Sequence, residues 1–370
     1  MTWNWERPDW PHFKWDSARL TQAEEQFLLD AGVAIGTVKH LGDEEQTQLL
    51  VELMSAEAVT TSAIEGEVLN RASVQSSILR QLGLAPADKQ RVKPAEQGIA
   101  EVMVDLYRSF SKPLSAEMLY GWHRMVTAER KDLTNVGKYR TSREAMQVIS
   151  GRIGAPKIHF EAPPSKQVSA EMKRFVWWFN GTAPRGKEPL PAITRAGTAH
   201  LYFESIHPFE DGNGRIGRAI AEKALTQSFG QPALVSLATT ILAHQKSYYR
   251  ALENANRQNE ITEWLVWFAE IALEAQHRSI RQVEFILTKA KLLDRLRGQI
   301  NERQQKALLR MFREGPEGFE GGLSAGNYGK ITGASPATTT RDLADLVEKD
   351  ALIRTGERRH ARYALKLTQS

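Results

Sequence analysis

Apolar residues recur at the spacing of an α-helix through most of the first 300 positions. In residues 44–64 they form one stripe, and Gly66 is placed to end that helix. The same periodicity, which starts near Thr21, predicts further helices at 71–83, 94–110, 115–127, 166–180, 192–206, 214–228, 246–257 and 261–297. The pattern therefore predicts a mainly α protein.

One stretch between these helices has the pattern of strands instead. Residues 146–150 (MQVIS) and 157–161 (KIHFE) flank the turn-rich hexamer GRIGAP. Turn residues between two short runs of this kind predict a β-hairpin, and the length of the hexamer predicts a loop longer than the tight two-residue type.

The two ends of the chain differ from the helical middle. Residues 1–15 hold four tryptophans between prolines, so we expect an extended arm whose rings pack on the body of the protein. After residue 300 the pattern is helix, glycine-rich loop (315–322), two short helices and two strands, which is the order of a winged helix. We therefore predict an N-terminal region at 1–92, a core domain at 93–285 and a winged-helix domain at 286–370.

Composition narrows the chemistry. The chain has 370 residues, of which 41% are hydrophobic, so it can bury a sizeable core. It has no cysteine, which excludes disulfides, thiolate metal sites and cysteine nucleophiles. The net charge, 49 − 44 = +5, is compatible with nucleotide binding but does not decide it. Neither a signal-peptide pattern nor a bilayer-spanning apolar run is found, so we expect a cytoplasmic protein without a membrane partner.

The segment HPFEDGNGRIGR, at 207–218, combines several backbone features of an anion-binding site. Pro208 disfavours helical geometry in the residue before it, so the preceding helix should end near His207. Gly212 and Gly214 let the main chain approach a ligand closely. A helix resumes at about Gly214, and the backbone N–H groups at its N-terminus favour an anion.

Charged residues of the same segment suit a phosphate bound together with a cation. Arg215 and Arg218 lie on the same side of the second helix, where each can hold phosphate oxygens. A carboxylate from Asp211 suits Mg²⁺, which binds through one or two carboxylates plus substrate oxygens. His207, with an ordinary pKa near ~6.5, suits proton removal at neutral pH. Each feature alone is usually structural, but their combination within twelve residues predicts a functional anion site.

This segment resembles the signature of the Fic (fido) family, HPFx(D/E)GNGRxxR, and matches it at every fixed position. Residues 137–140 (GKYR) resemble the family's Gly-x-Tyr-Arg stretch, and the hairpin at 146–161 resembles its "flap". The resemblance extends over most of the chain. It implies a Fic helical core with a β-hairpin flap, an N-terminal helical segment and a C-terminal winged-helix domain.

The resemblance also implies a protein adenylyltransferase, which moves AMP from ATP to a Ser, Thr or Tyr hydroxyl of a protein target, including itself. His207 would deprotonate the hydroxyl, Asp211 would hold Mg²⁺ between the α- and β-phosphates, and Arg218 would grip the γ-phosphate. Phosphate oxygens would be cradled by Gly212, Asn213, Gly214 and Arg215. A related subfamily that phosphorylates its target with a reversed nucleotide has a basic residue at the position of Gly214, so the glycine favours AMP transfer.

Two further parts of the chain would complete the site. Tyr248, Leu252 and Asn256 share one face of a predicted helix, which is either core or, by the resemblance, the lining of an adenine pocket. The neighbouring Tyr249 is a second candidate for that contact. The flap is either a structural hairpin or a strand edge that pairs with a target segment, and His159 on it is a rival catalytic histidine without an adjacent anion site. The candidate docking residues are Met146, Gln147, Val148, Ile149 and Ser150.

The segment TTSAIEGE, at 60–67, places a carboxylate at the end of a predicted helix. The helix dipole disfavours Glu65 there, so this side chain is either solvated or has a partner. The segment matches the family's inhibitory motif (S/T)xxxE(G/N). The resemblance therefore implies that Glu65 pairs with Arg218 and withdraws it from the γ-phosphate. Glu65 could alternatively position a water that removes AMP from modified targets.

The C-terminal module admits two functions. Residues 335–349 resemble a recognition helix on which Arg341 and three threonines face outward, and residues 354–362 form a basic wing. This predicts contacts with the phosphate backbone of DNA. Winged helices also dock proteins or form homodimers, and three acidic residues of the same helix oppose DNA. Two alternatives for the whole protein are a DNA-binding regulator whose core senses nucleotide, and transfer of a different group such as UMP.

Overall fold

The computed structural model describes residues 2–85, 92–152, 155–231, 235–315, 318–319 and 321–367. Residues 153 and 154 of the expected hairpin loop, and 316, 317 and 320 of the expected glycine-rich loop, lie outside the described residues. The chain forms two compact units: Met1–Ile35 with Leu50–Ser279, and Gly36–Leu49 with Ile280–Ser370. Helices predominate in both, which confirms the expectation of a mainly α fold.

The helices expected up to residue 297 are all present. They are α1 (Thr21–Val38), α2 (Asp43–Ile64), α3 (Arg71–Gln81), α4 (Pro94–Ser109), α5 (Ala116–Val126), α6 (Ser165–Gly181), α7 (Ala192–Ile206), α8 (Asn213–Phe229), α10 (Gln245–Ala255) and α11 (Thr262–Arg295). A further helix, α9 (Leu237–Ala243), was not predicted, because seven residues are too few to establish a period. Helices α1, α2 and α11 contribute residues to both units.

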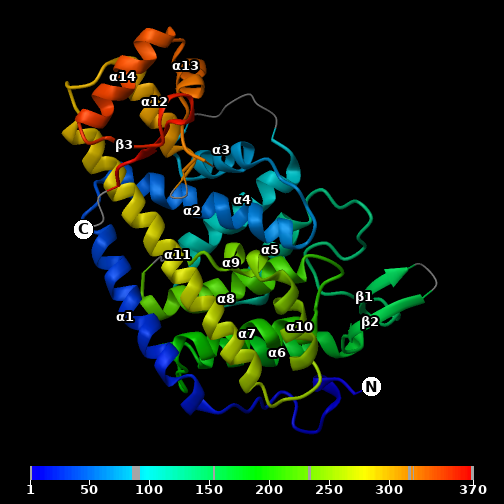
Figure 1. Ribbon diagram of the computed structural model, residues 1–370. Helices are drawn as coiled ribbons and strands as arrows, with labels where there is room; N and C mark the ends of the chain where they lie inside the picture. Colours follow the sequence, from blue (N-terminus) through cyan, green and yellow to red (C-terminus); the bar gives the residue numbers. More distant parts are fainter. Residues whose placement is uncertain are drawn as a thin grey trace. The chain divides into compact units, whose positions relative to one another are not determined.

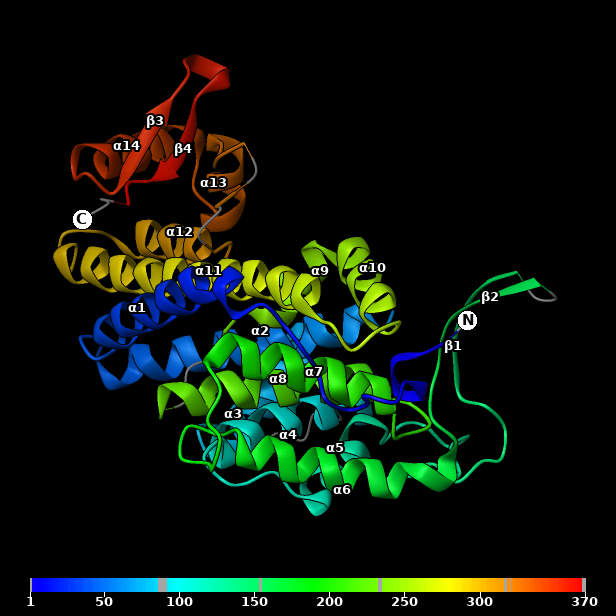
Figure 2. The ribbon, with the colours of Figure 1, turned by 90° about the horizontal axis from the view of Figure 1, so that it is seen from below.

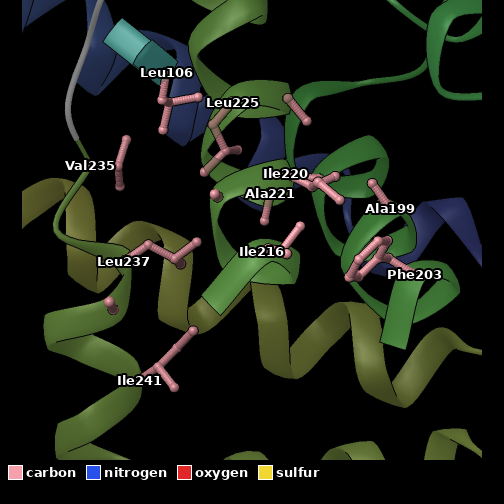
Figure 3. Close-up of a cluster of buried hydrophobic side chains, with 14 of the residues drawn as sticks. Leu106, Ala199, Phe203, Ile216, Ile220, Ala221, Leu225, Val235, Leu237 and Ile241 are labelled. Carbon is pink, nitrogen blue, oxygen red and sulfur yellow. The ribbon is translucent and has the colours of Figure 1, made fainter. Parts of the chain in front are cut away.

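Helices α7 and α8 lie at the centre of the first unit (Figure 1). Every residue of α7 is buried, including the polar side chains of Arg195, His200 and Glu204. Figure 3 shows Phe203 of α7, Ile220 and Leu225 of α8 and Leu106 of α4 among the side chains of one buried hydrophobic cluster. Each such buried side chain stabilises the fold by about 1.5–3 kcal/mol. The loop between α7 and α8 is therefore anchored in the core at both of its ends.

A buried carboxylate from α1 fixes the start of α7. Glu24 accepts hydrogen bonds from the backbone N–H groups of Ile193 (3.0 Å) and Thr194 (2.7 Å), and from the Thr194 hydroxyl at 2.8 Å. These N–H groups belong to the first turn of α7, where they have no acceptor within the helix and the helix dipole favours a negative charge. Glu24 is therefore buried with its hydrogen bonds satisfied.

An antiparallel hairpin stands off the helices of the first unit (Figures 1 and 2). It consists of β1 (Gln147–Arg152) and β2 (Ala155–Glu161). Val148 pairs with Phe160, whereas the next residue, Ile149, pairs with Ile158. The register therefore shifts by one position, and His159 is the extra residue of a β-bulge. Bulges of this kind redirect a side chain, often beside a functional site.

The N-terminal arm packs on the body of the first unit, as its tryptophans indicated. The Trp3 ring meets Phe160 of the hairpin edge-on, with 5.4 Å between ring centroids. The side chain of Asn4 donates a hydrogen bond to Ser205 Oγ at 2.8 Å and is fully buried. Since Ser205 lies in the last turn of α7, the arm supports the same helix end that carries the loop.

The second unit contains α12 (Glu302–Phe312), α13 (Ala325–Thr332), α14 (Pro336–Glu348) and the antiparallel pair β3 (Leu352–Thr355) and β4 (Arg362–Leu365). This is the element order expected from the sequence. One expectation within α14 was wrong, because Thr339, which was assigned to its outer face, is only 3% exposed. Within the described ranges, none of the helices combines the length and apolarity needed to cross a lipid bilayer.

Candidate active site

The segment between α7 and α8 turns sharply at both ends. His207 follows α7 with left-handed backbone angles, φ 48° and ψ 61°, and Gly212 precedes α8 with φ 79°. The first hydrogen bond of the α8 ladder runs from the N–H of Ile216 to the carbonyl of Gly212, over 3.1 Å. The N–H groups that precede it have no acceptor within the helix and belong to Asn213, Gly214 and Arg215. Together with the helix dipole, these groups favour an anion.

Two buried side chains hold this loop in shape. The side-chain oxygen of Asn213 accepts the N–H of Phe209 at 3.0 Å, and its amide nitrogen donates to the carbonyl of Phe209 at 2.9 Å. Arg140, from the GKYR stretch, donates to the carbonyl of His207 at 2.8 Å and to that of Pro163 at 2.6 Å. The side chain of Asn213, which was expected to cradle phosphate, therefore shapes the loop from within.

His207 is uncharged at neutral pH. Burial lowers the pKa of its imidazole to about 4, and the positive charge of Arg140 acts in the same direction. A hydrogen bond with the backbone of Glu204 opposes this shift without cancelling it. A neutral imidazole can accept a proton, and the left-handed backbone presents it at the start of the anion-binding turn.

Glu204 lies one helical turn before His207 and is also uncharged at neutral pH. Its Oε2 is 3.7 Å from Nδ1 of His207. Its Oε1 is buried and has no hydrogen-bond partner among the described residues. Burial raises the pKa of the Glu204 carboxyl to about 8, and the negative charge of Glu65 adds to the shift. A protonated carboxyl is consistent with this position, since an unpaired buried carboxylate would be strongly destabilising.

Residues at the end of α2 bind Arg218, the second arginine of the loop segment. The Nε of Arg218 donates to Thr61 Oγ1 at 2.7 Å, and its Nη2 donates to the Thr61 carbonyl at 2.9 Å and to Glu65 Oε1 at 2.7 Å. The Arg218 side chain is 3% exposed. Thr61 and Glu65, four positions apart, therefore bind one guanidinium together. The structure contains the Glu65–Arg218 ion pair that the family resemblance implied.

A second carboxylate follows on the same segment and was not anticipated. Glu67 Oε2 lies 2.7 Å from Nη1 of Arg215, whose side chain is also 3% exposed. The Nη2 of Arg215 lies 3.8 Å from Asp211, and Asp211 in turn forms an ion pair with Arg130. Both arginines of the loop segment are thus paired with carboxylates from residues 65–67.

A cleft of about 740 Å³ opens beside the loop. Glu65, Glu204, His207 and Gly214 line one part of it. The part that was predicted to bind adenine is lined by Tyr248, Tyr249, Leu252 and Asn256. The structure therefore brings the predicted base, the start of α8 and the predicted adenine pocket into a single cavity.

The two tyrosines differ in how far they face the cleft. Tyr248 is 2% exposed, and its hydroxyl lies 2.9 Å from Nε2 of His200, so it belongs largely to the core. Tyr249 is 46% exposed and donates a hydrogen bond to the carbonyl of Ile64 at 3.1 Å. The exposed ring of Tyr249 is therefore the better placed of the two to stack against a base. Asn256 is buried and accepts a hydrogen bond from Ser205 at 3.2 Å.

The flap contributes only part of its predicted residues to the cleft. Val148, Ile149 and Ser150 line it. Gln147 instead donates a hydrogen bond to Glu161 at 2.7 Å within the hairpin. Met146 packs against the buried cluster of Trp3, Phe160 and Ala162. The first two positions of the predicted docking segment are thus used by the hairpin itself.

The residues present fit a triphosphate with Mg²⁺. Nε of Arg215 and Nη1 of Arg218 are buried and have no hydrogen-bond partner among the described residues, so each has a donor to offer. Asp211 is the carboxylate on the loop. The described part of the chain holds no cluster of three or more metal-ligating side chains.

Sequence reasoning assigned no role to several residues that the structure places at the site. Glu67 and Arg130 carry no local signal, because each acts through a partner far along the chain. Arg140 lies in a stretch that was singled out, although its bond to the His207 carbonyl could not be foreseen. Glu204 did carry a signal, since it is a carboxylic acid in the apolar helix just before the catalytic candidate.

Two sequence profiles match parts of the chain. Residues 113–225 match the Fic/DOC family, and residues 3–84 match a domain of unknown function (DUF4172). The protein adenylyltransferase fic-1 of Caenorhabditis elegans is 26% identical over 200 residues, which cover 53% of this chain and 35% of that protein. The probable protein adenylyltransferase aq_aa38 of Aquifex aeolicus is 28% identical over 96 residues, 26% of each chain. This chain therefore spans about a third or less of the curated relatives it matches.

Solved structures share the fold. A Fic family protein from Desulfovibrio desulfuricans G20 superimposes with a TM-score of 0.53 at 20% identity, covering 94% of this chain and 97% of that one. Residues 134–508 of Fic-1 from C. elegans superimpose with a TM-score of 0.51 at 21% identity, covering 71% and 74%. The loop between two buried helices, its flap and these similarities agree: the chain contains a domain of the Fic/DOC family within a Fic-like helical fold.

Proposed function

We propose that this protein is an adenylyltransferase that transfers AMP from ATP to a hydroxyl of a protein target, and that Glu65 restrains it. The observation that carries the proposal is the shared cleft. In it the neutral imidazole of His207 lies with Gly214 at the start of α8 and with Glu65, whose carboxylate binds Arg218. The names of the similar proteins support the same reaction.

In the proposed reaction the protein mainly orients its substrates. The backbone N–H groups of Gly214 and Arg215 hold phosphate oxygens, and Arg218 takes the γ-phosphate once Glu65 has left it. Asp211 would hold Mg²⁺, which would neutralise part of the phosphate charge. His207 removes the proton of the target hydroxyl, whose oxygen bonds to the α-phosphorus while the bond to the leaving pyrophosphate breaks. Arg140 keeps His207 in place by holding its carbonyl.

Glu65 would restrain AMP transfer because it competes with the γ-phosphate for the guanidinium of Arg218. Glu65 and Thr61 engage Nε and Nη2 of Arg218, which leaves Nη1 as its remaining donor for a phosphate. In addition, a methyl group placed on Gly214 would come within 2.2 Å of Glu65 Oε1, so this carboxylate stands directly at the start of α8. ATP bound beside it would lack the grip on the γ-phosphate that aligns the α-phosphorus for attack.

The test compares three forms of the full chain with ATP labelled at its α-phosphate and Mg²⁺. We expect Glu65→Gly to raise AMP incorporation into protein by at least about tenfold, because Arg218 becomes available. We expect Glu65→Gly with His207→Ala to transfer no AMP to an added protein target, because the base for that transfer is missing. Incorporation is measured by gel autoradiography, and mass spectrometry of the product distinguishes AMP from UMP or phosphate.

Glu52→Ala is the matched control, since Glu52 also forms an ion pair from α2, with Arg71, but does not line the cleft. It should behave as the unmodified chain. Equal, weak labelling of the unmodified chain and Glu65→Gly would refute the restraint. Absence of any AMP-modified protein in the Glu65→Gly form would refute the transferase activity itself.

A further inference from the structure

A serine, a histidine and a glutamate form consecutive hydrogen bonds where the flap meets α10. Ser150 Oγ lies 2.6 Å from Nε2 of His159, and Nδ1 of His159 lies 2.8 Å from Oε2 of Glu253. The ammonium of Lys157 lies 3.3 Å from the other oxygen of Glu253. The proposed transfer to a target assigns no role to these residues.

The partners of the histidine ring define which atoms donate. The hydrogen bond from His159 and the charge of Lys157 lower the pKa of Glu253, so this side chain is a carboxylate that can only accept. Nδ1 of His159 therefore donates to Glu253, and in the tautomer whose proton is on Nδ1 the other nitrogen, Nε2, accepts the hydroxyl hydrogen of Ser150. A serine hydroxyl bonded to an imidazole that is oriented by a carboxylate is the arrangement that activates an oxygen nucleophile.

The fold builds this arrangement rather than leaving it to flexible side chains. His159 is the extra residue of the β-bulge, so its side chain is set by the shift in pairing between the two strands. Glu253 comes from the helix that also carries the predicted adenine-binding residues. Ser150, His159 and Glu253 all line the cleft that contains His207 and Gly214. An activated hydroxyl of this chain thus faces the proposed nucleotide site.

We propose that Ser150 is a site at which this chain attaches AMP to itself, with His159 as the base for that step. The proposal rests on the proposed adenylyltransferase function. The Oγ of Ser150 bonds to the α-phosphorus of ATP, and the bond from that phosphorus to the β-phosphate oxygen breaks. Pyrophosphate leaves with that electron pair, and the serine proton passes to Nε2 of His159. Glu253 is a positioning residue, which holds the ring and stabilises its positive charge.

The site is tested in the full chain carrying Glu65→Gly, incubated with Mg²⁺ and ATP. Digestion and site-resolved mass spectrometry should find AMP on the peptide that contains Ser150. Adding Ser150→Ala should remove most of the incorporated AMP. Adding Ser142→Ala should leave incorporation unchanged, because Ser142 is an exposed serine just before the flap whose hydroxyl accepts a hydrogen bond from the backbone N–H of Glu144.

The roles of His159 and Glu253 are tested by the rate at which AMP is attached to the same peptide. We expect His159→Gln to slow it on the order of 100-fold, because a positioned base is lost. Glu253→Gln keeps an acceptor for Nδ1 but removes the charge, so we expect a loss on the order of tenfold with the KM for ATP unchanged. A purely structural role for Glu253 would raise that KM as well, and would overturn its assignment.

Two outcomes distinguish a failure of the Ser150 proposal from a failure of the proposed function. If the Glu65→Gly chain carries AMP only on other residues, and Ser150→Ala changes nothing, Ser150 is not an acceptor and the proposed function still stands. If no residue of the chain or of any added protein carries AMP, both are overturned. Circular dichroism of each variant confirms that folding is retained, which is expected because Ser150 lies on the surface.

Discussion

Single residues at the site have acid–base properties set by burial rather than by their type. His207 has its pKa lowered to about 4, whereas Glu204, one turn away, has its pKa raised to about 8. In both cases removal from water disfavours the charged form, and in both cases the residue is neutral at pH 7. The proposed base, His207, is therefore neutral because it is buried.

This state of His207 predicts the acid side of the pH profile. An imidazole with an ordinary pKa near 6.5 would lose about tenfold of its neutral form on going to pH 5.5, whereas one with a pKa of about 4 loses almost none. Single-turnover AMP transfer by the Glu65→Gly chain should therefore be flat from about pH 5.5 to 7.5. A tenfold fall at the acid end would contradict it.

The same shift affects stability with a defined sign. The imidazole of His207 binds a proton more readily in the unfolded chain than in the folded one. Protonation of His207 therefore lowers the free energy of unfolding as the pH falls below about 6.5, and this loss is complete below the folded pKa of about 4.

Glu67 allows a separate prediction about ATP affinity. Its carboxylate holds Nη1 of Arg215, a residue proposed to bind phosphate, so Glu67→Ala should free that donor. In the Glu65→Gly background we expect the Kd of Mg²⁺-ATP to fall by about three- to tenfold, measured by titration calorimetry, which corresponds to about 1 kcal/mol. Glu52→Ala serves again as the control, and an unchanged Kd for the Glu67 variant would show that the pair does not compete with nucleotide.

At the scale of elements, the close approach of α4 to α5 depends on one glycine. A methyl group on Gly98 of α4 would lie 1.9 Å from the carbonyl oxygen of Met125 in α5, whereas one on Gly32 of α1 would meet nothing within 4 Å. Both glycines lie inside helices, where alanine is intrinsically favoured by about 0.5–1 kcal/mol. Only at Gly98 does a backbone atom of the neighbouring helix stand in the way.

Alanine at these two positions should therefore change stability in opposite directions. We expect Gly98→Ala to lower the free energy of unfolding by about 2–3 kcal/mol or more, because the two helices must move apart. Gly32→Ala should raise it by about 0.5–1 kcal/mol. Thermal and urea unfolding of both variants measure the difference, and a destabilisation of equal size at both positions would show that the contact with Met125 does not matter.

Much of the fold could be predicted because its signals are local. Helices α2 to α8 follow from apolar periodicity, and the loop at 207–218 follows from glycine, proline and charge within one short segment. The unpredicted parts are contacts between distant positions. Glu67 and Arg215 are 148 positions apart, and nothing near either residue indicates the other. The bulge that aligns His159 also depends on strand register, which the alternation of residues does not determine at this point.

At the scale of the whole molecule, the charges of the second unit bear on whether the protein binds DNA. The acidic residues of α14 had been an objection to DNA binding. Asp342 is 6% exposed and accepts hydrogen bonds from Arg303 and Tyr328 at 3.0 Å each. Asp345 forms an ion pair with Lys349 at 2.5 Å. Two of the three acidic side chains are therefore neutralised within the unit, while Arg341 is exposed.

We accordingly expect the full chain to bind short duplex DNA with an affinity that falls as salt rises. Arg341→Ala should weaken binding to all sequences alike and reduce the slope of log K against log salt by about 1. Arg297→Ala is the control, since Arg297 is a highly exposed arginine of the same unit that pairs with Asp294. Gel shifts at several salt concentrations make the measurement, and an affinity indifferent to salt would favour a protein partner or a homodimer instead.

The left-handed backbone of His207 has a practical consequence for capturing a substrate complex. Few side chains tolerate φ 48°, but asparagine does so readily, since its short polar side chain suits this region. Replacing the imidazole by a carboxamide would thus delete the proton acceptor while preserving the bend on which Arg140 and the start of α8 depend. We therefore expect the form that carries His207→Asn, Glu65→Gly and Ser150→Ala to hold ATP and an unmodified target together for crystallisation.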